Sequence, residues 1–128
     1  MEFYPICDET LALSTNLWYS LSGSGESPFM RVGHTIIHYK NIQNNNSDRG
    51  SLLVIGGANP SECFKDCYSL DLNKLAWDKF EDPKHFETGR YEHACFQAKD
   101  GQVYIFAGAD QEKNFNDVIR FDIEKKGN

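Results

Sequence analysis

The residues best suited to chemistry in this sequence are two histidines that each follow an arginine by three positions. His34 follows Arg31, and His93 follows Arg90. Histidine titrates near neutral pH and can donate or accept a proton in catalysis. The same Arg-x-x-His spacing occurs twice, however, 59 residues apart, and a catalytic residue has no reason to recur in each copy of a repeat. We therefore predict structural roles for both pairs and no catalytic residue.

Two adjacent glycines, Gly56 and Gly57, end the aliphatic run "LLVIGGANP" and could cradle a phosphate. A phosphate loop needs a helix directly behind it, whose first N–H groups point at the anion. The residues that follow, "SECFKDCYSLDL", instead alternate with the period of two that is typical of a strand. The stretch "SGSGES" at 22–27 lacks the Lys-Ser/Thr ending of a phosphate loop and is predicted to be a flexible connector. No cofactor site is expected.

Four cysteines offer a second kind of chemistry: Cys7, Cys63, Cys67 and Cys95. The start of the chain has neither the basic segment nor the sustained apolar stretch of a secretion signal, so we expect a cytoplasmic protein with reduced thiols. Cys63 and Cys67 have no second Cys or His pair at the spacing of a zinc site. No metal site is therefore predicted.

The overall charge points to a protein partner. Thirteen Lys and Arg against nineteen Asp and Glu give a net charge of −6, and no basic stripe stands out. Nucleic acid and anionic membrane surfaces are therefore poor partners. No stretch approaches the roughly 18 apolar residues of a membrane-spanning helix, so direct insertion into a membrane is not expected. With 40% hydrophobic residues in 128, the chain can form one folded domain.

One unit occurs twice in the chain, which decides the fold. Trp, Arg and His recur 59 residues apart, whereas Gly and Asp positions further along recur 51 residues apart. The difference of eight falls in the polar stretch "KNIQNNNSDRG", which is typical of an elongated loop. The residues predicted to carry the repeat are Trp18, Arg31, His34, Gly56, Gly57, Asp66, Asp71, Trp77, Arg90, His93, Gly108, Asp117 and Asp122.

Each unit predicts four short strands, which in the first unit are "GHTIIHY", "SLLVIGG", "DCYSLDL" and "AWDKF". Short connections imply antiparallel pairing, because parallel strands need long crossovers. Glycine allows another sheet to approach, tryptophan fills space between sheets, and Asp71 and Asp122 can accept bonds from turns. A sheet that is apolar on both faces must stack, and radial stacking gives a propeller. We predict an all-β fold of about two four-stranded antiparallel blades, an incomplete β-propeller.

These marks resemble the kelch repeat, with an aliphatic run ending in Gly-Gly, an Asp-led strand ending in Asp, and a Trp six residues later. The resemblance covers residues 18 to 123 and implies a non-enzymatic propeller that docks protein partners. More narrowly, "RVGH", "VIGGANP", "SLDLNKLAWD" and "GRYEHACF" together resemble the N-terminal part of the kelch-motif effectors of a late-endosomal Rab GTPase. This implies a small GTPase of the Rab family as partner, peripheral location on endosomal membranes through that partner, and a role in vesicle transport from endosomes to the trans-Golgi.

The repeat divides the chain into an N-terminal extension (1–17), an outer strand of a neighbouring or closing blade (18–21), blade 1 (31–80) and blade 2 (90–128). Blade 2 lacks its fourth strand, because the position 51 residues after Trp77 is Asn128. Ala107 replaces the first glycine of the pair, which predicts local strain or looser packing. Two sheets fall short of the roughly four to eight blades of a closed propeller. We therefore expect a truncated or fragmentary part of a longer propeller.

Open strand edges and rim loops are the surfaces expected to bind other molecules. An open edge pairs with other chains, so one copy's Trp18 strand could complete the next copy's sheet, head to tail. Loops on a rigid scaffold usually carry recognition. The rim positions predicted to contact a protein partner are Asn59, Glu62, Gln111 and Lys113.

Two rival interpretations fit parts of the sequence. A propeller enzyme would need convergent carboxylates or a copper-binding Tyr and His set, and two blades supply neither. The distance from Gly33-His34 to Trp77-Asp78 also fits a WD repeat, but the second unit has no Trp-Asp. A non-enzymatic kelch module is preferred, with a truncated product lacking independent function as the alternative.

Overall fold

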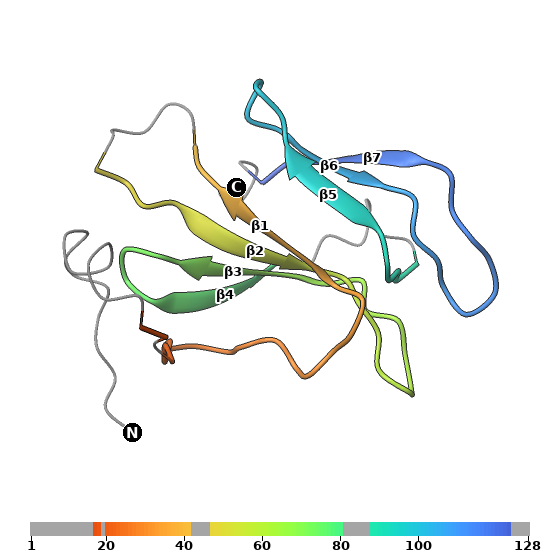
Figure 1. Ribbon diagram of the computed structural model, residues 1–128, viewed down its shortest axis with the longest axis horizontal. Helices are drawn as coiled ribbons and strands as arrows, with labels where there is room; N and C mark the ends of the chain where they lie inside the picture. The colour runs from red at the N-terminus through yellow and green to blue at the C-terminus, as the bar shows by residue number, and fades with distance from the viewer. Residues whose placement is uncertain (1–16, 19, 42–46, 81–87, 124–128) are drawn as a thin grey trace.

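The computed structural model describes residues 17, 18, 20–41, 47–80 and 88–123, which form two antiparallel sheets and no helix (Figure 1). The first sheet has the strand order β1-β2-β3-β4 and the second has the order β5-β6-β7. The strands are β1 (Thr35–Tyr39), β2 (Ser51–Ile55), β3 (Cys67–Asp71), β4 (Ala76–Phe80), β5 (Ala94–Gln97), β6 (Val103–Phe106) and β7 (Val118–Phe121). The predicted all-β fold, with one four-stranded sheet and one incomplete sheet, is confirmed.

Within each sheet, every strand pairs with the strand that precedes it in the sequence. In the turn between β3 and β4, the Asp71 carboxylate accepts hydrogen bonds from the N–H groups of Asn73 (2.8 Å) and Lys74 (3.0 Å). This turn places Leu70 opposite Trp77 in the antiparallel register. The pairing is antiparallel throughout the described sheets.

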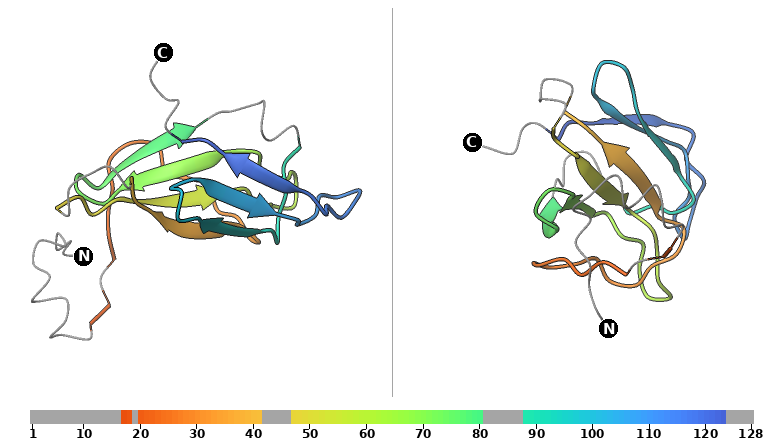
Figure 2. Two further views of the ribbon diagram at one scale, coloured as in Figure 1. Left: turned by 90° about the horizontal axis from the view of Figure 1, so that it is seen from above. Right: turned by 60° about the vertical axis from the view of Figure 1, so that its left-hand side comes forward.

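The hydrophobic core lies between the two sheets, where β1 and β5 run side by side (Figures 1 and 2). Its buried residues come from both sheets: Leu53, Ile55, Cys67, Val103, Ile105 and Phe121. Fully burying each large aliphatic or aromatic side chain stabilises the fold by about 1.5–3 kcal/mol. Because successive side chains of a strand point to opposite faces, one face of each sheet packs against the other sheet.

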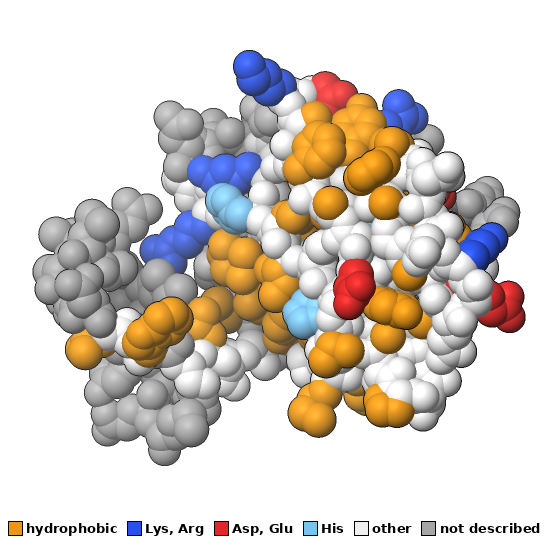
Figure 3. Space-filling view, turned by 45° about the vertical axis from the view of Figure 1, so that its right-hand side comes forward, with side chains coloured by type: hydrophobic (Ala, Val, Ile, Leu, Met, Phe, Trp, Pro, Cys, Tyr) orange, Lys and Arg blue, Asp and Glu red, His pale blue; other side chains and the backbone are white. Residues whose placement is uncertain are grey.

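The outer face of the second sheet is apolar and open. Phe96, Phe106 and Val118 are 53%, 49% and 63% exposed, and the ring of Phe96 stacks on that of Tyr104 at 5.6 Å. Figure 3 shows hydrophobic side chains gathered over this sheet in the upper part of the view. The repeat counterparts of Phe96, Phe106 and Val118 in the first sheet are Ile37, Ile55 and Cys67, which pack in the core between the sheets.

The segment before the first sheet follows the outer edge of β4. Ser24 donates its N–H to the carbonyl of Leu75 (2.9 Å) and accepts the N–H of Trp77 (2.8 Å). A Cβ atom on Gly23 would lie 2.9 Å from the Trp77 indole, so the missing side chain allows the approach. The prediction of a flexible connector over 22–27 was therefore wrong around Ser24, because a backbone without large side chains can reach the strand edge.

The two repeated tryptophans have different surroundings. Trp77 lies within β4 and is half-buried, whereas Trp18 is fully exposed at 101%. None of the described residues at 17–21 lies in a strand, so within this chain Trp18 does not fill space between sheets. The outer strand at 18–21 stays a prediction, since its expected partner is another sheet.

Several predicted features lie outside the described residues. These are residues 1–16 of the N-terminal extension with Cys7, the Asn-rich positions 42–46, the connector at 81–87 and the end of blade 2 at 124–128. Among the residues that the structure does describe, no helix is long and apolar enough to cross a membrane.

Candidate partner-binding groove

Arg31 fastens the entry of the first sheet to the loop between β2 and β3. Its guanidinium forms a two-point ion pair with the Asp66 carboxylate, with an Nη2–Oδ2 distance of 3.3 Å. Nη1 also donates to the carbonyl of Gly56 at 3.0 Å, and the guanidinium lies 4.0 Å above the Phe64 ring. A planar fork of donors suits a carboxylate and a carbonyl at once. We call this set of contacts the Arg–Asp clamp.

The second sheet repeats the Arg–Asp clamp with the residues at the equivalent positions of the repeat. Arg90 binds Asp117 through Nη1–Oδ1 (2.7 Å) and Nη2–Oδ2 (3.1 Å), and donates to the carbonyl of Ala107 at 2.8 Å. The guanidinium lies 4.1 Å above the Phe115 ring. The hydrogen bond from Arg90 holds the pKa of the Asp117 carboxyl below its usual value of 3.8. Each Arg–Asp clamp fixes the rim loop of its own sheet.

Backbone hydrogen bonds join the two sheets directly beside the clamps. The N–H of Gly57 donates to the carbonyl of Arg90 (2.8 Å), and the N–H of Glu92 donates to the carbonyl of Gly33 (2.7 Å). These bonds run between the rim of the first sheet and the segment that enters β5. The two rims are therefore held in a fixed relation to one another.

His93 packs in the interface between the sheets. Its side chain is buried, and its Nε2 lies 2.9 Å from the Thr35 hydroxyl. Burial, with a smaller contribution from the Arg90 charge, lowers the pKa of His93 to about 4. The ring is therefore uncharged at neutral pH and holds a structural position. His34 is half-buried at the equivalent position of the first sheet.

Position 56 requires glycine because the second sheet comes close to it. Gly56 has φ +59°, and a Cβ atom there would lie 2.7 Å from the carbonyl oxygen of Arg90. Its repeat counterpart, Ala107, has the same φ of +59°, a left-handed conformation that is strained for alanine. The strain expected at Ala107 is thus present. Gly56 turns the chain where the second sheet packs against it.

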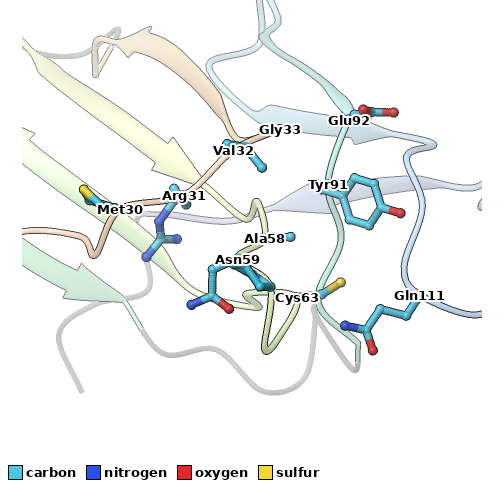
Figure 4. Close-up of a pocket in the computed structure, with 11 residues that line it drawn as sticks. Met30, Arg31, Val32, Gly33, Ala58, Asn59, Cys63, Tyr91, Glu92 and Gln111 are labelled. Carbon is cyan, nitrogen blue, oxygen red and sulfur yellow. The ribbon is translucent and has the colours of Figure 1, made fainter.

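A groove of about 890 Å³ opens where the rims of the two sheets meet (Figure 4). The apolar residues that line it are Met30, Val32, Ala58, Pro60, Cys63 and Tyr91. Met30 and Val32 are 93% and 70% exposed, so the apolar floor is open to solvent. The polar lining comes from Asn59 and Gln111, with Glu92 at the edge of the groove. Such a surface can bind a partner through apolar contacts and a few polar contacts.

The four predicted partner-binding residues do not all lie in the groove. Asn59 and Gln111 line it, whereas Glu62 and Lys113 are exposed outside the lining. The Asn59 side-chain oxygen accepts the N–H groups of Ser61 (2.8 Å) and Glu62 (2.9 Å), so it also caps its own loop. Partner contact through these four residues stays a prediction.

Sequence reasoning missed the groove residues Met30, Val32, Tyr91 and Glu92. They belong to the segments that enter β1 and β5, and nothing in the sequence shows that these two segments face each other. One signal was available for Glu92, since the 59-residue repeat aligns it with Gly33.

Burial keeps the two thiols in the sheet interface protonated at neutral pH. Burial raises the pKa of Cys67 to about 12 and that of Cys95 to about 11. Within the described part of the chain, no group of three or more His, Cys, Asp or Glu side chains is placed to hold a metal ion. The arrangement of the groove suits binding.

Comparison with known proteins identifies the repeat. A family model described as the KLHDC2/KLHL20/DRC7 Kelch-repeats domain matches residues 8–127. The chain belongs to the kelch-repeat family. The two sheets are therefore kelch blades, with β1 to β4 forming blade 1 and β5 to β7 forming blade 2.

Kelch proteins of one kind recur among the similar sequences. The chain is 39% identical over 103 residues to the Rab9 effector protein with kelch motifs of Xenopus laevis, which covers 79% of this chain and 27% of that protein. The human protein of that name is 38% identical over 101 residues, covering 77% and 26%. The Danio rerio protein is 31% identical over 128 residues, covering 94% and 36%. The chain spans roughly a quarter to a third of these curated relatives.

Proposed function

We propose that this chain is a non-enzymatic protein-interaction module that binds a partner in the groove between blades 1 and 2. The observation that carries the proposal is an open apolar groove on a rim that the two Arg–Asp clamps and the inter-blade hydrogen bonds hold in place. A preformed site loses little conformational entropy when it binds. Loops on a rigid scaffold are the usual place for recognition.

The proposed partner is a small GTPase of the Rab family, which would bring this cytoplasmic module to endosomal membranes for vesicle transport to the trans-Golgi. The support is the similarity to proteins named as Rab9 effectors with kelch motifs, at 39% and 38% identity. The proposal assigns to this chain a partner that is named for relatives about four times as long.

The test measures binding of the purified 128-residue chain to human Rab9 loaded with a non-hydrolysable GTP analogue or with GDP. We expect binding in the GTP-analogue state. Val32→Ser, in the groove, is expected to weaken binding about tenfold, because an exposed valine that becomes buried contributes about 1.5 kcal/mol. Val118→Ser is the matched control, since Val118 is 63% exposed on the outer face of blade 2 against 70% for Val32.

Two outcomes would contradict the proposal. If the chain binds Rab9 in neither nucleotide state, the proposal of a Rab partner is wrong. Equal loss in Val32→Ser and Val118→Ser would remove the groove as the binding site and leave a general apolar attraction.

One observation favours the alternative, a part of a longer propeller without independent function. The open face of blade 2 is the repeat counterpart of the blade 1 face that blade 2 covers. Such a face exposes apolar surface that monomeric proteins usually cover. If the alternative holds, the purified chain will bind a hydrophobic dye strongly and aggregate, and Val118→Ser will reduce both effects.

A further inference from the structure

Glu92 occupies a backbone position that favours glycine. The equivalent residue of blade 1 is Gly33, with φ +64°, and Glu92 itself has φ +55°. The position needs this conformation, because the N–H of Glu92 donates to the carbonyl of Gly33 across the blade interface at 2.7 Å. Glycine adopts a positive φ without the steric cost that a glutamate incurs. A strained residue of this kind points to a function of its side chain.

The Glu92 side chain is open to solvent. Its carboxylate makes no hydrogen bond or ion pair with any other described residue. Figure 4 shows Glu92 at the edge of the groove, beside Gly33 and Tyr91. The one cation among the described lining residues is Arg31, whose guanidinium is buried and paired with Asp66. Glu92 is therefore the uncompensated charge of the groove lining that the structure describes.

We propose that Glu92 makes the groove selective for an extended protein segment in which a Lys or Arg stands beside an apolar residue. The cation pairs with the Glu92 carboxylate, and the apolar side chain packs on Val32 and Tyr91. Opposite charge steers association, and the net charge of −6 on the chain acts in the same direction. This inference rests on the proposed function, because it names the kind of segment that the groove of that proposal binds.

The test uses two fluorescein-labelled ten-residue peptides, one alternating lysine with leucine and one alternating glutamate with leucine. Fluorescence anisotropy with the full chain is expected to show at least tenfold tighter binding of the lysine peptide. Glu92→Gln keeps the size of the side chain and is expected to weaken that binding about fivefold, the effect of losing one partly exposed ion pair. Glu112→Gln, an exposed acid outside the groove lining, is expected to leave it unchanged.

A second variant separates binding from folding. Glu92→Gly removes both the charge and the backbone strain, so it is expected to lose the same affinity while its melting temperature rises. A lower melting temperature would overturn the argument from strain. Equal weakening by Glu92→Gln and Glu112→Gln would mean general attraction to an acidic protein and would overturn the selectivity.

The outcomes also separate this inference from the proposed function. If Rab9 binds and Val32→Ser weakens it, the groove is the partner site whatever the peptides do. If the two peptides then bind equally and Glu92→Gln has no effect, the role of Glu92 is wrong and the groove stands.

Discussion

Exchanging the residues at positions 56 and 107, which are equivalent in the two blades, should change stability in opposite directions. Both positions have φ +59°, but only Gly56 is covered by a following blade. Gly56→Ala adds a Cβ atom 2.7 Å from the carbonyl oxygen of Arg90. Ala107→Gly removes a methyl group from a strained conformation.

The magnitudes follow from three contributions. Alanine in the left-handed conformation costs about 1–2 kcal/mol relative to glycine, and glycine loses about 0.4–1 kcal/mol through the greater freedom of the unfolded chain. Ala107→Gly should therefore raise the free energy of unfolding by roughly 0.5–1 kcal/mol. Gly56→Ala should lower the free energy of unfolding by the same amount, and overpacking against a backbone atom should lower it by about 1–3 kcal/mol more. Its total cost should be roughly 2–4 kcal/mol.

Urea unfolding followed by tryptophan fluorescence measures both changes, because Trp77 lies in a paired strand whose environment is lost on unfolding. Unchanged m-values would show that the variants change the free energy of unfolding without changing the compactness of the folded or the unfolded state. If Gly56→Ala is as stable as the parent, or Ala107→Gly is less stable, blade 2 does not pack over Gly56 as described.

Three further predictions concern titration, the clamp and thiol access. Folding lowers the pKa of His93 from 6.5 to about 4, so as the pH falls the unfolded chain takes up a proton before the folded chain does. The free energy of unfolding should therefore be highest above pH 6.5 and be about 3 kcal/mol lower at pH 4. Urea titrations of His93→Gln should lack this slope, and those of the exposed His38→Gln should keep it. Asp117→Asn should cost no more than about 1 kcal/mol, since the Asp117 side chain is 45% exposed. The carboxyl has a lowered pKa, so this cost should be present above pH 3.8 and vanish as the pH falls further; a cost that persists in acid would contradict the ion pair. Iodoacetamide at pH 8 should modify Cys63 well before Cys67, whose pKa burial raises to about 12, and peptide mass spectrometry showing equal rates in native buffer would mean that the blade interface is open.

The strands could be predicted because their pattern is local. Alternation and turn residues located the four strands of blade 1, and "AWDKF" coincides with β4 (Ala76–Phe80). The duplication then predicted stacked sheets. Both signals depend on short-range chemistry that a sequence displays directly.

The contacts that build the groove could not be predicted in the same way. The sequence showed that Arg31 and Asp66 each recur, but they are 35 residues apart, and their pairing depends on how the entry segment folds over the rim loop. Likewise, the bond between Glu92 and Gly33 joins two different blades. Contacts of this kind are fixed by packing, and periodicity carries no information about them.

The pairing of Ser24 with the edge of β4 was missed for a related reason. A Gly- and Ser-rich stretch is usually a flexible linker, and its composition alone predicts no partner. The partner exists because β4 has an edge that blade 1 itself leaves unpaired, and small residues can approach the Trp77 indole.

The stacking of blade 2 on the glycine pair of blade 1 can be measured directly by nuclear Overhauser effects in the isotope-labelled chain. Nε2 of His93 lies 2.9 Å from the Thr35 hydroxyl, and Cε1 of the same ring lies 2.9 Å from where a Cβ of Gly56 would be. Strong cross-peaks are therefore predicted from the His93 Hε1 proton to the Gly56 α-protons and to the Thr35 side chain. If the His93 Hε1 proton gives cross-peaks only to protons of blade 2, the packing on which the groove depends is wrong.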